Sequence, residues 1–260
     1  MEKPYGLKYS PSEKKGGTFY DEQKKRPYQI NREHITRHKV SVEISDDNIS
    51  FVKEVMKMVK PKVIMEIGVM RNATRSFTRI FLDEKDKETV YVDIDRMGKG
   101  NLDDAEKNIY TLRTDSGDYG KVTVFIKQLG AFPIDLLFID GYHSIEQVEK
   151  DWKYVDLLSD EGVILLHDTN FHDGPAELFE AVDERMFEKK KYFQHEGDWG
   201  MAIIKRRKEW KSGKLKNLKA AGSLEISSPV HTKPEKSKSD ISGTTKVRSG
   251  IGTTIKKPSK

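Results

Sequence analysis

Two apolar runs that each end at a carboxylate constrain the fold of this chain more than any other feature. The first, Ile134–Ile139, is followed directly by Asp140, and the second, Gly162–Leu166, is followed by His167 and Asp168. Runs of this length and apolarity are typical of strands that are buried on both faces, as in a parallel sheet covered by helices.

The residues between the two runs complete a strand–helix–strand unit. Segment 144–158 places its apolar side chains at helical spacing with charged residues between them: Ile145, Val148, Trp152, Val155 and Leu158. The crossover in such a unit is right-handed, so the two strands are expected to run parallel. Asp140 and Asp168 should then lie side by side at the carboxyl edge of the sheet, where open α/β sheets bind ligands.

The same alternation extends along the chain on both sides of this unit. We expect further helices over 46–60, 72–82, 119–129 and 175–188, and further strands over 62–67, 89–93, 108–112 and 199–205. Strands that alternate with helices indicate an α/β fold with a doubly wound, mostly parallel, Rossmann-like sheet and helices on both faces.

Charge is distributed unevenly and suggests where the folded domain ends. Residues 205–260 hold 16 Lys and Arg against 4 Asp and Glu, a net charge of +12, whereas residues 1–204 hold 31 against 38, a net charge of −7. We expect an N-terminal extension or lid over 1–40, a folded domain over 41–207 and a disordered basic tail over 208–260, because the tail has too little apolar surface to offset its ordering entropy.

The basic tail has two interpretations. Its Lys and Arg side chains could attract nucleic acid through salt-dependent contacts to phosphates. It could equally be a solubilising extension, which we favour because aromatic side chains that would stack on bases are nearly absent after Trp210.

Several classes of protein are excluded or disfavoured by what the sequence lacks. Without cysteine, the chain has no disulfides and no thiolate metal site. No apolar run approaches the ~20 residues that span a bilayer, and the N-terminus has no signal-peptide pattern. We therefore expect a cytoplasmic protein without membrane association, and an oligomer is left open.

The first predicted strand carries the pattern of a nucleoside-binding turn. Glu66 and Gly68 lie at its end, just before a helix whose N-terminus favours a carboxylate or phosphate. Asp93, at the end of the second strand, is spaced correctly for two ribose hydroxyls. Because the dinucleotide fingerprint needs three spaced glycines and only Gly68 is present, NAD binding is disfavoured.

From about residue 46 to residue 205 the chain resembles the class I S-adenosylmethionine-dependent methyltransferases, and more narrowly the metal-dependent O-methyltransferases that act on macrolide sugars and on catechol. The resemblance is carried most specifically by Phe138–His143 followed by Gly162–Thr169, and more weakly by the turn from Glu66 to Gly68. It implies the same Rossmann-like fold and S-adenosylmethionine as cofactor.

The resemblance also implies the residues that bind this cofactor. Those expected at its methionine part are Glu66, Gly68 and Met70, with Thr74 at its carboxylate, Asp93 at the ribose, Asp115 and Ser116 at the adenine, and Asp140 nearby. The chain departs from the family at Asn72, where a glycine is usual, and this substitution could reshape the turn.

A divalent cation, Mg²⁺ or Mn²⁺, is expected at Asp140, His167 and Asp168. Two carboxylates on neighbouring strands can share a hard cation. The macrolide-sugar enzymes have an acid in place of His167, and an imidazole suits Mn²⁺, Fe²⁺ or Zn²⁺ better than Mg²⁺. In catechol O-methyltransferase the third ligand corresponds instead to Thr169. Asp140 and Asp168 are therefore the firmer ligands, unless Asp168 only caps its loop.

His143 is the candidate catalytic base, because the macrolide-sugar enzymes place a histidine at the matching position. A neutral hydroxyl is a weak nucleophile, and an imidazole can remove its proton. The alternative is a histidine that only decorates the first helical turn. His172 and Asp173 follow on the next loop, where they either face the substrate opening or lie on a solvated loop, and we favour the solvated loop.

The sequence therefore predicts an enzyme that transfers the methyl group of S-adenosylmethionine to a hydroxyl of a sugar or other small metabolite. Two alternatives stay open. One is a cofactor-binding module without methyl transfer, recruited to nucleic acid by the basic tail. The other is a hydroxylase-like relative of the same fold. Acceptor loops vary freely on this scaffold, so the sequence does not name the acceptor.

Overall fold

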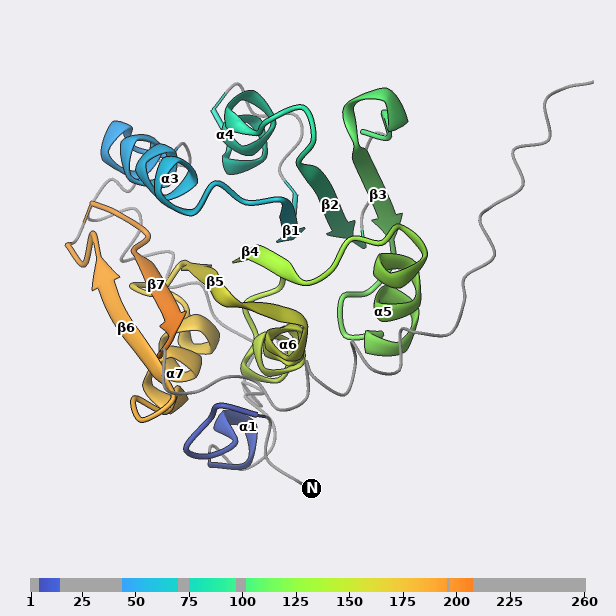
Figure 1. Ribbon diagram of the computed structural model, residues 1–260. Helices are drawn as coiled ribbons and strands as arrows, with labels where there is room; N and C mark the ends of the chain where they lie inside the picture. The colour runs from blue at the N-terminus through green and yellow to red at the C-terminus, as the bar shows by residue number, and fades with distance from the viewer. Residues whose placement is uncertain (1–4, 15–43, 70–74, 97–101, 196, 208–260) are drawn as a thin grey trace, which may run out of the picture. The chain divides into compact units, whose positions relative to one another are not determined.

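The computed structural model describes residues 5–14, 44–69, 75–96, 102–195 and 197–207 (Figure 1). The predicted basic tail over 208–260 lies outside these ranges, as does most of the predicted N-terminal extension. Both therefore stay predictions.

Seven strands form one sheet, in the order β3-β2-β1-β4-β5-β7-β6 (Figure 1). The first five strands in this order are parallel, and β7 runs antiparallel to both β5 and β6. The strand bounds are β1 (Val63–Ile67), β2 (Val90–Asp95), β3 (Ile109–Arg113), β4 (Ile134–Ile139), β5 (Leu158–His167), β6 (Phe187–Tyr192) and β7 (Met201–Arg206). The predicted doubly wound, mostly parallel sheet is confirmed, and its strand order reverses between β1 and β4.

Helices cover both faces of this sheet (Figure 1). α3 (Asp46–Val59) and α4 (Phe77–Glu84) lie on one face, and α5 (Tyr119–Gln128), α6 (Ile145–Asp151) and α7 (Asp173–Ala181) lie on the other. Short helical turns add α1 (Pro11–Lys14), η1 (Ala105–Lys107) and η2 (Trp152–Leu157). Most of the longer helices begin at a side-chain cap: the caps of α3, α4 and α6 are Ser45, Ser76 and Ser144, each of which accepts a backbone N–H three residues further on.

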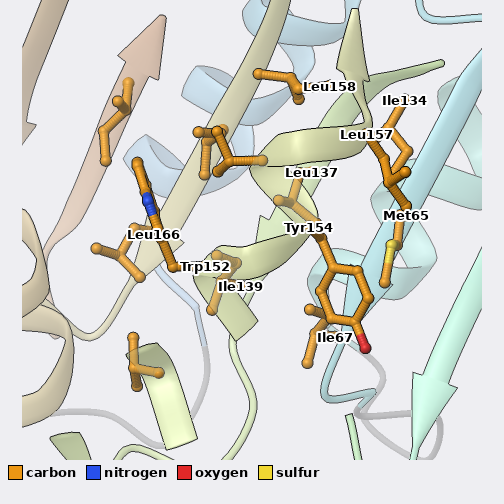
Figure 2. Packing of buried hydrophobic residues seen from close by; sticks show 14 of the residues in the cluster. Met65, Ile67, Ile134, Leu137, Ile139, Trp152, Tyr154, Leu157, Leu158 and Leu166 are labelled. Carbon is orange, nitrogen blue, oxygen red and sulfur yellow. The ribbon is translucent and has the colours of Figure 1, made fainter. Parts of the chain in front are cut away.

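Each face of the sheet has its own buried apolar layer. On the face of α3 and α4, strand residues such as Phe138 pack against Phe77 and Phe81, with ring centroids 4.9 and 5.2 Å apart. On the opposite face, Trp152 and Tyr154 of η2 lie over strand residues including Leu137 and Ile139 (Figure 2). Trp152 is fully buried, as its place in the predicted helical pattern requires.

The predicted helix over 175–188 is wrong in its second half. α7 ends at Ala181, because Leu7 pairs with Val182 as an antiparallel bridge and Lys8 N–H donates to Ala181 O. The N-terminal segment thus takes a backbone acceptor that a longer helix would use. Residues 187–192 instead form β6, an edge strand whose three consecutive lysines suit a position that must resist further strand pairing.

Two other helices differ from the prediction in their bounds. α4 begins at Phe77, after the cap at Ser76, and not at Asn72; residues 72–74 lie among those that the structure leaves undescribed. The predicted helix over 144–158 is α6 followed by the tighter turn η2, and β5 begins as early as Leu158. The remaining predicted elements are confirmed within a few residues.

The described part of the N-terminal segment packs on α6 and α7. Ser10 Oγ, Ser12 N and Ser12 Oγ all donate hydrogen bonds to the carboxylate of Glu149, at 2.6, 3.0 and 2.6 Å. Trp152 Nε1 donates to Tyr5 O at 2.8 Å. Within the ranges that the structure describes, no helix has the length and apolarity needed to cross a membrane.

Candidate functional site

A cavity of about 710 Å³ lies at the carboxyl ends of β1, β2, β4 and β5. Its size falls within the roughly 300–1,000 Å³ of typical ligand sites. It also spans the point between β1 and β4 where the strand order reverses, which is where open α/β sheets bind ligands. The cavity is therefore the candidate site for the cofactor.

The close contact between the ends of β1 and β4 requires a glycine at position 68. Its φ is +83°, and a Cβ atom there would lie 2.2 Å from Asp140 O and 2.6 Å from Gly141 Cα. Only glycine tolerates both the left-handed backbone and this close approach. Gly68 thus allows the turns after β1 and β4 to meet at the bottom of the cavity.

Most of the predicted cofactor residues line this cavity. They are Glu66, Gly68, Asp115, Ser116 and Asp140. Met70 and Thr74 fall in the undescribed range 70–74, so their predicted roles stay predictions. The predicted positions of the strand-end turns are thus correct, although the structure does not test what these residues bind.

Glu66 is a buried acid held by two hydroxyls. Thr78 Oγ1 donates to Glu66 Oε1 at 2.7 Å, and Tyr91 donates to Glu66 Oε2. Burial raises the pKa of Glu66 to about 8, despite these two hydrogen bonds, which lower it. At neutral pH Glu66 is therefore protonated and can present a neutral carboxyl group to the cavity.

Asp93 lies deeper than the sequence predicts. Strand β2 continues to Asp95, so Asp93 is internal to the strand, is fully buried and accepts a hydrogen bond from Thr111 Oγ1 at 2.9 Å. Asp95, at the strand end, lines the cavity, whereas Asp93 does not. The sequence reads Asp93-Ile94-Asp95, and both acids fit the expected spacing. Only the position of the strand end in the structure shows which of the two lines the cavity.

The predicted adenine subsite is organised by a residue that sequence reasoning missed. Gln147 of α6 lines the cavity and donates from Nε2 to Ser116 Oγ at 2.9 Å and to Asp151 Oδ1 at 3.0 Å. Asp115 Oδ1 accepts from Gly117 N at 2.8 Å, which fixes the turn after β3. In the sequence Gln147 is one of the polar residues of the predicted helix over 144–158, so its position gave no sign of a binding role.

Two aspartates and three histidines form a cluster beside the cofactor cavity. His167 Nδ1 lies 3.0 Å from Asp140 Oδ1 and 3.1 Å from Asp168 Oδ1. His143 Nε2 lies 3.0 Å from Asp168 Oδ2 and 3.4 Å from Asp140 Oδ1. His172 Nε2 lies 3.7 Å from Asp168 Oδ2. The structure thus brings together all four predicted metal and base residues, and it adds His172.

The favoured prediction of a solvated loop is wrong for His172. His172 is 4% exposed, and its ring stacks on Trp199 at a centroid distance of 5.9 Å and an interplanar angle of 9°. The backbone N–H of His172 donates to Asp168 O at 3.2 Å, and His172 is the residue just before α7. Asp173, the first residue of α7, is exposed. A histidine four residues after a strand-end aspartate was the signal that the sequence offered.

Backbone geometry fixes the positions of the cluster residues. Asp168 has a φ of +60°, the left-handed region that aspartate tolerates better than most residues, and this turns the chain directly after β5. A Cβ at Gly174 would lie 2.3 Å from His143 O, so only glycine lets α7 approach the loop that carries His143. His167 is buried against Phe77, at a ring distance of 4.8 Å.

The charges within the cluster stabilise one another. Burial favours the neutral forms, yet the two carboxylates outweigh it and raise the pKa of His143 to about 10 and that of His167 to about 9. The charge of His167, and hydrogen bonds with both histidines, hold the pKa of Asp140 well below its usual range against the effect of burial. Burial and the charge of His143 lower the pKa of His172 to about 4.

The donor set fits a divalent cation. Asp140, His167 and Asp168 each offer one ligand atom, and these atoms lie within 4.8 Å of one another. Two carboxylate oxygens with one imidazole nitrogen suit Mn²⁺ or Fe²⁺ at least as well as Mg²⁺. Thr169, the alternative third ligand, accepts a hydrogen bond from Gln194 Nε2 at 3.0 Å, away from the triad.

A second, smaller cavity of about 230 Å³ adjoins the first and shares Ile44, Arg75, His167 and Trp199 with it. Its other walls are polar. Asn48 is 2% exposed, and its Nδ2 donates a hydrogen bond to Asp198 Oδ2. Its Oδ1 accepts no hydrogen bond from the residues that the structure describes. Arg75 forms an ion pair with Asp46. This side cavity was not predicted, because it combines α3 with the loop between β6 and β7.

Comparison with known proteins relates one segment of the chain to a known domain. The family model of a methyltransferase domain matches residues 65–169, which run from within β1 to two residues after the end of β5. No curated protein matches the chain significantly in sequence.

Solved structures with similar folds include three O-methyltransferases. One is from Bacillus cereus, in complex with SAH (13% identity, 68% of this chain and 90% of that chain, TM-score 0.45). Another is TomG from Streptomyces achromogenes, involved in tomaymycin synthesis, in complex with SAM (11%, 67% and 86%, 0.46). A third is MycE from the mycinamycin biosynthetic pathway, in complex with Mg, SAH and mycinamycin VI (14%, 67% and 52%, 0.48). This chain thus spans about half the length of MycE.

The matched segment contains β2 to β5 and most of β1, the turn at Gly68 and both strand-end aspartates that the sequence singled out. The predicted resemblance is therefore confirmed over residues 65–169, which match a methyltransferase domain.

Proposed function

We propose that this protein transfers the methyl group of S-adenosylmethionine to a hydroxyl oxygen of a small polar acceptor, with assistance from a divalent cation. The observation that carries the proposal is the triad of Asp140, His167 and Asp168 at the edge of the cofactor cavity, with His143 in contact with both of its carboxylates. A cation together with a base is what the activation of a neutral hydroxyl needs.

The cofactor would lie along the carboxyl ends of the first strands. The turn at Gly68 would admit its methionine part, and Glu66 would offer a protonated carboxyl group there. Asp95 is the better placed acid for the ribose, because it lines the cavity and Asp93 does not. Ser116, oriented by Gln147, would lie at the adenine. The sulfonium would then face the aspartate cluster.

The acceptor oxygen would be activated at the cluster. A divalent cation held by Asp140, His167 and Asp168 would lower the pKa of the acceptor hydroxyl and offset the carboxylate charge that keeps His143 protonated. His143 Nε2 would take the hydroxyl proton while the oxygen–methyl bond forms and the methyl–sulfur bond breaks. The products are a methyl ether and S-adenosylhomocysteine, and the proton remains on His143.

The side cavity supports a small, polar acceptor. It shares His167 and Trp199 with the cofactor cavity, and it offers both donors, from Arg75, and acceptors, from Asn48 and Asp198. Its volume of about 230 Å³ is below the range of sites for drug-sized ligands. A hydroxylated ring such as a sugar, or another small metabolite with several hydroxyl groups, fits this combination better than a wholly apolar phenol.

The proposal is tested by incubating the full chain with methyl-labelled S-adenosylmethionine and a panel of sugars, phenols and RNA, with and without EDTA. We expect label on a small hydroxyl compound, lost in EDTA and restored by excess Mg²⁺ or Mn²⁺. Full activity in EDTA would contradict the metal assistance. The absence of any binding of S-adenosylhomocysteine in calorimetry would contradict the cofactor.

The recruitment of a non-methylating module to nucleic acid stays a prediction, because the basic tail lies beyond the part of the chain that the structure describes. Binding of RNA that is lost when residues 208–260 are removed, with no label on any acceptor, would favour it. The hydroxylase-like alternative predicts product without transfer of label.

A further inference from the structure

Asp168 has two groups of neighbours, one on each carboxylate oxygen. Oδ1 faces His167, which belongs to the triad described above, at 3.1 Å. Oδ2 faces His143 at 3.0 Å and His172 at 3.7 Å. The ligand atoms of His143, Asp168 and His172 lie within 4.8 Å of one another, so they form a second group with the dimensions of a metal site.

We propose that His143, Asp168 and His172 form a second cation subsite that takes a nitrogen-preferring transition metal such as Zn²⁺, with Asp168 bridging the two subsites, and that its occupancy inhibits methyl transfer. The inhibitory part rests on the function proposed above, in which His143 accepts the proton.

The distances suit coordination. Zn²⁺ binds histidine nitrogen and carboxylate oxygen at about 2.0–2.2 Å, which at the tetrahedral angle places two ligand atoms of one ion roughly 3.3–3.6 Å apart. The separations of Asp168 Oδ2 from His143 Nε2, 3.0 Å, and from His172 Nε2, 3.7 Å, each lie within a few tenths of an ångström of that interval. A carboxylate that bridges two ions with its two oxygens is a common arrangement in two-metal sites.

The two imidazoles are held in place by their surroundings. The His143 and His172 rings lie 4.3 Å apart at 31°, and Trp199 stacks on the outer face of His172. The close approach of Gly174 to His143 O fixes the loop on which His143 lies. Rings that are already oriented lose little entropy when they bind an ion, so the subsite is preorganised.

The two subsites differ in the ions that they prefer. The triad of Asp140, His167 and Asp168 has more oxygen than nitrogen ligands, whereas the second group has two imidazoles and one carboxylate. Imidazole ligands favour Zn²⁺ over Mg²⁺. A zinc ion on His143 would occupy the nitrogen lone pair that must take the acceptor's proton, and this is why we expect inhibition.

The test compares His172→Gln with His195→Gln in the full chain saturated with S-adenosylhomocysteine. His195 is an exposed histidine outside the cluster, so it controls for the loss of any imidazole. Bound metal is first removed from each protein by chelation and dialysis. The number of Zn²⁺ ions that then bind tightly to each chain is measured by calorimetry. We expect His172→Gln to bind one fewer tight equivalent than the wild type, and His195→Gln to match the wild type.

Inhibition is measured as the Zn²⁺ concentration that halves Mn²⁺-supported turnover. Loss of a ligand should raise this concentration by about 10-fold or more in His172→Gln. Equal zinc stoichiometry in His172→Gln and the wild type would overturn the subsite. Since a misfolded variant could also lose zinc, cofactor binding in each variant is measured in the same titration. A wild-type protein with a single tight zinc overturns the proposal without any variant.

These outcomes are distinguishable from failure of the proposed function. If turnover is sensitive to EDTA but only one zinc binds, the second subsite is wrong and the proposed function stands. If two zinc ions bind and turnover is indifferent to EDTA, the subsite stands and the role of the cation in catalysis is wrong.

Discussion

Two pairs of acids at the same edge of the sheet have opposite surroundings. Glu66 and Asp93, on β1 and β2, are buried among hydroxyl groups from Thr78, Tyr91 and Thr111. Asp140 and Asp168, at the ends of β4 and β5, are surrounded by imidazoles. Burial raises the pKa of Glu66 to about 8, and hydrogen bonds from its neutral hydroxyl partners do not offset it, whereas the imidazole partners of Asp140 outweigh burial and hold its pKa well below the usual range.

This comparison shows that the surroundings of an acid decide its role more than its place in the strand. Glu66, buried among hydroxyls, has a raised pKa and serves as a hydrogen-bonding group. Asp140, beside two imidazoles, has a lowered pKa and is available to a cation. The adenosine half of the site and the aspartate cluster are therefore chemically distinct, although the sequence marks both with a carboxylate after an apolar run.

The largest expected effect comes from His143→Ala on the imidazole side. Removal of the proton acceptor should lower kcat by about 10²–10⁴-fold, with little change in the affinity for S-adenosylhomocysteine. The loss should be smallest for acceptors whose hydroxyl is already acidic. Steady-state kinetics with calorimetry of cofactor binding measures both quantities, and an undiminished kcat would exclude His143 as the base.

A smaller effect separates the two acids of β2. Asp95→Ala should weaken binding of S-adenosylhomocysteine by roughly 10–100-fold, since a hydrogen bond to a charged group contributes about 1.5–3 kcal/mol. Asp93→Ala should instead lower the stability of the fold, because it leaves Thr111 Oγ1 without its acceptor inside the sheet. Calorimetry and thermal unfolding of both variants test the pair. If Asp93→Ala weakens the cofactor while Asp95→Ala does not, the original sequence prediction is right.

Glu66→Gln tests the hydroxyl side through pH. The folded pKa of Glu66, about 8, lies above its value in the unfolded chain, so ionisation of the unfolded chain lowers stability as pH rises from about 4.5 to 8. The glutamine does not titrate, so the variant should lose less stability than the wild type over that interval. Urea unfolding at pH 5 and pH 8 measures the difference. Parallel pH profiles would mean that Glu66 is ionised in the folded protein.

The smallest change is expected from His195→Gln, the control for the cluster. His195 is exposed and does not line either cavity. Its loss should change the free energies of cofactor binding and of unfolding by less than about 0.5 kcal/mol, as is usual at surfaces. A differential scanning measurement with and without S-adenosylhomocysteine checks this. A large loss of affinity would show that the loop before Trp199 takes part in cofactor binding.

Much of the fold could be predicted because it depends on local patterns. Apolar runs such as Leu136–Ile139 and Val163–Leu166 mark buried parallel strands, and Gly68 marks a turn that a side chain would obstruct. The end of α7 and the strand β6 could not be predicted in this way. The end of α7 depends on pairing between Leu7 and Val182, two residues far apart in the sequence, and β6 depends on its pairing with β7.

The candidate site divides in the same way. Asp140, His143, His167 and Asp168 follow directly from strand ends, so the sequence identified them. The residues that reach the cavities from helices, from the loop before α7 and from the loop between β6 and β7 are brought together only by the tertiary arrangement: Asn48, Gln147, His172 and Trp199. The difference between Asp93 and Asp95 depends on a strand that ends two residues later than its apolar pattern indicates.

The most direct test of the central claim is a Mn²⁺ titration followed by electron paramagnetic resonance in the wild type, Asp168→Asn and Glu66→Gln. All three proteins are saturated with S-adenosylhomocysteine, so that cofactor binding confirms the fold of each. We expect Asp168→Asn to lose Mn²⁺ binding and Glu66→Gln to bind it as the wild type does. Mn²⁺ binding retained in Asp168→Asn, or lost equally in both variants, would contradict the assignment of the cation to the imidazole-paired acids.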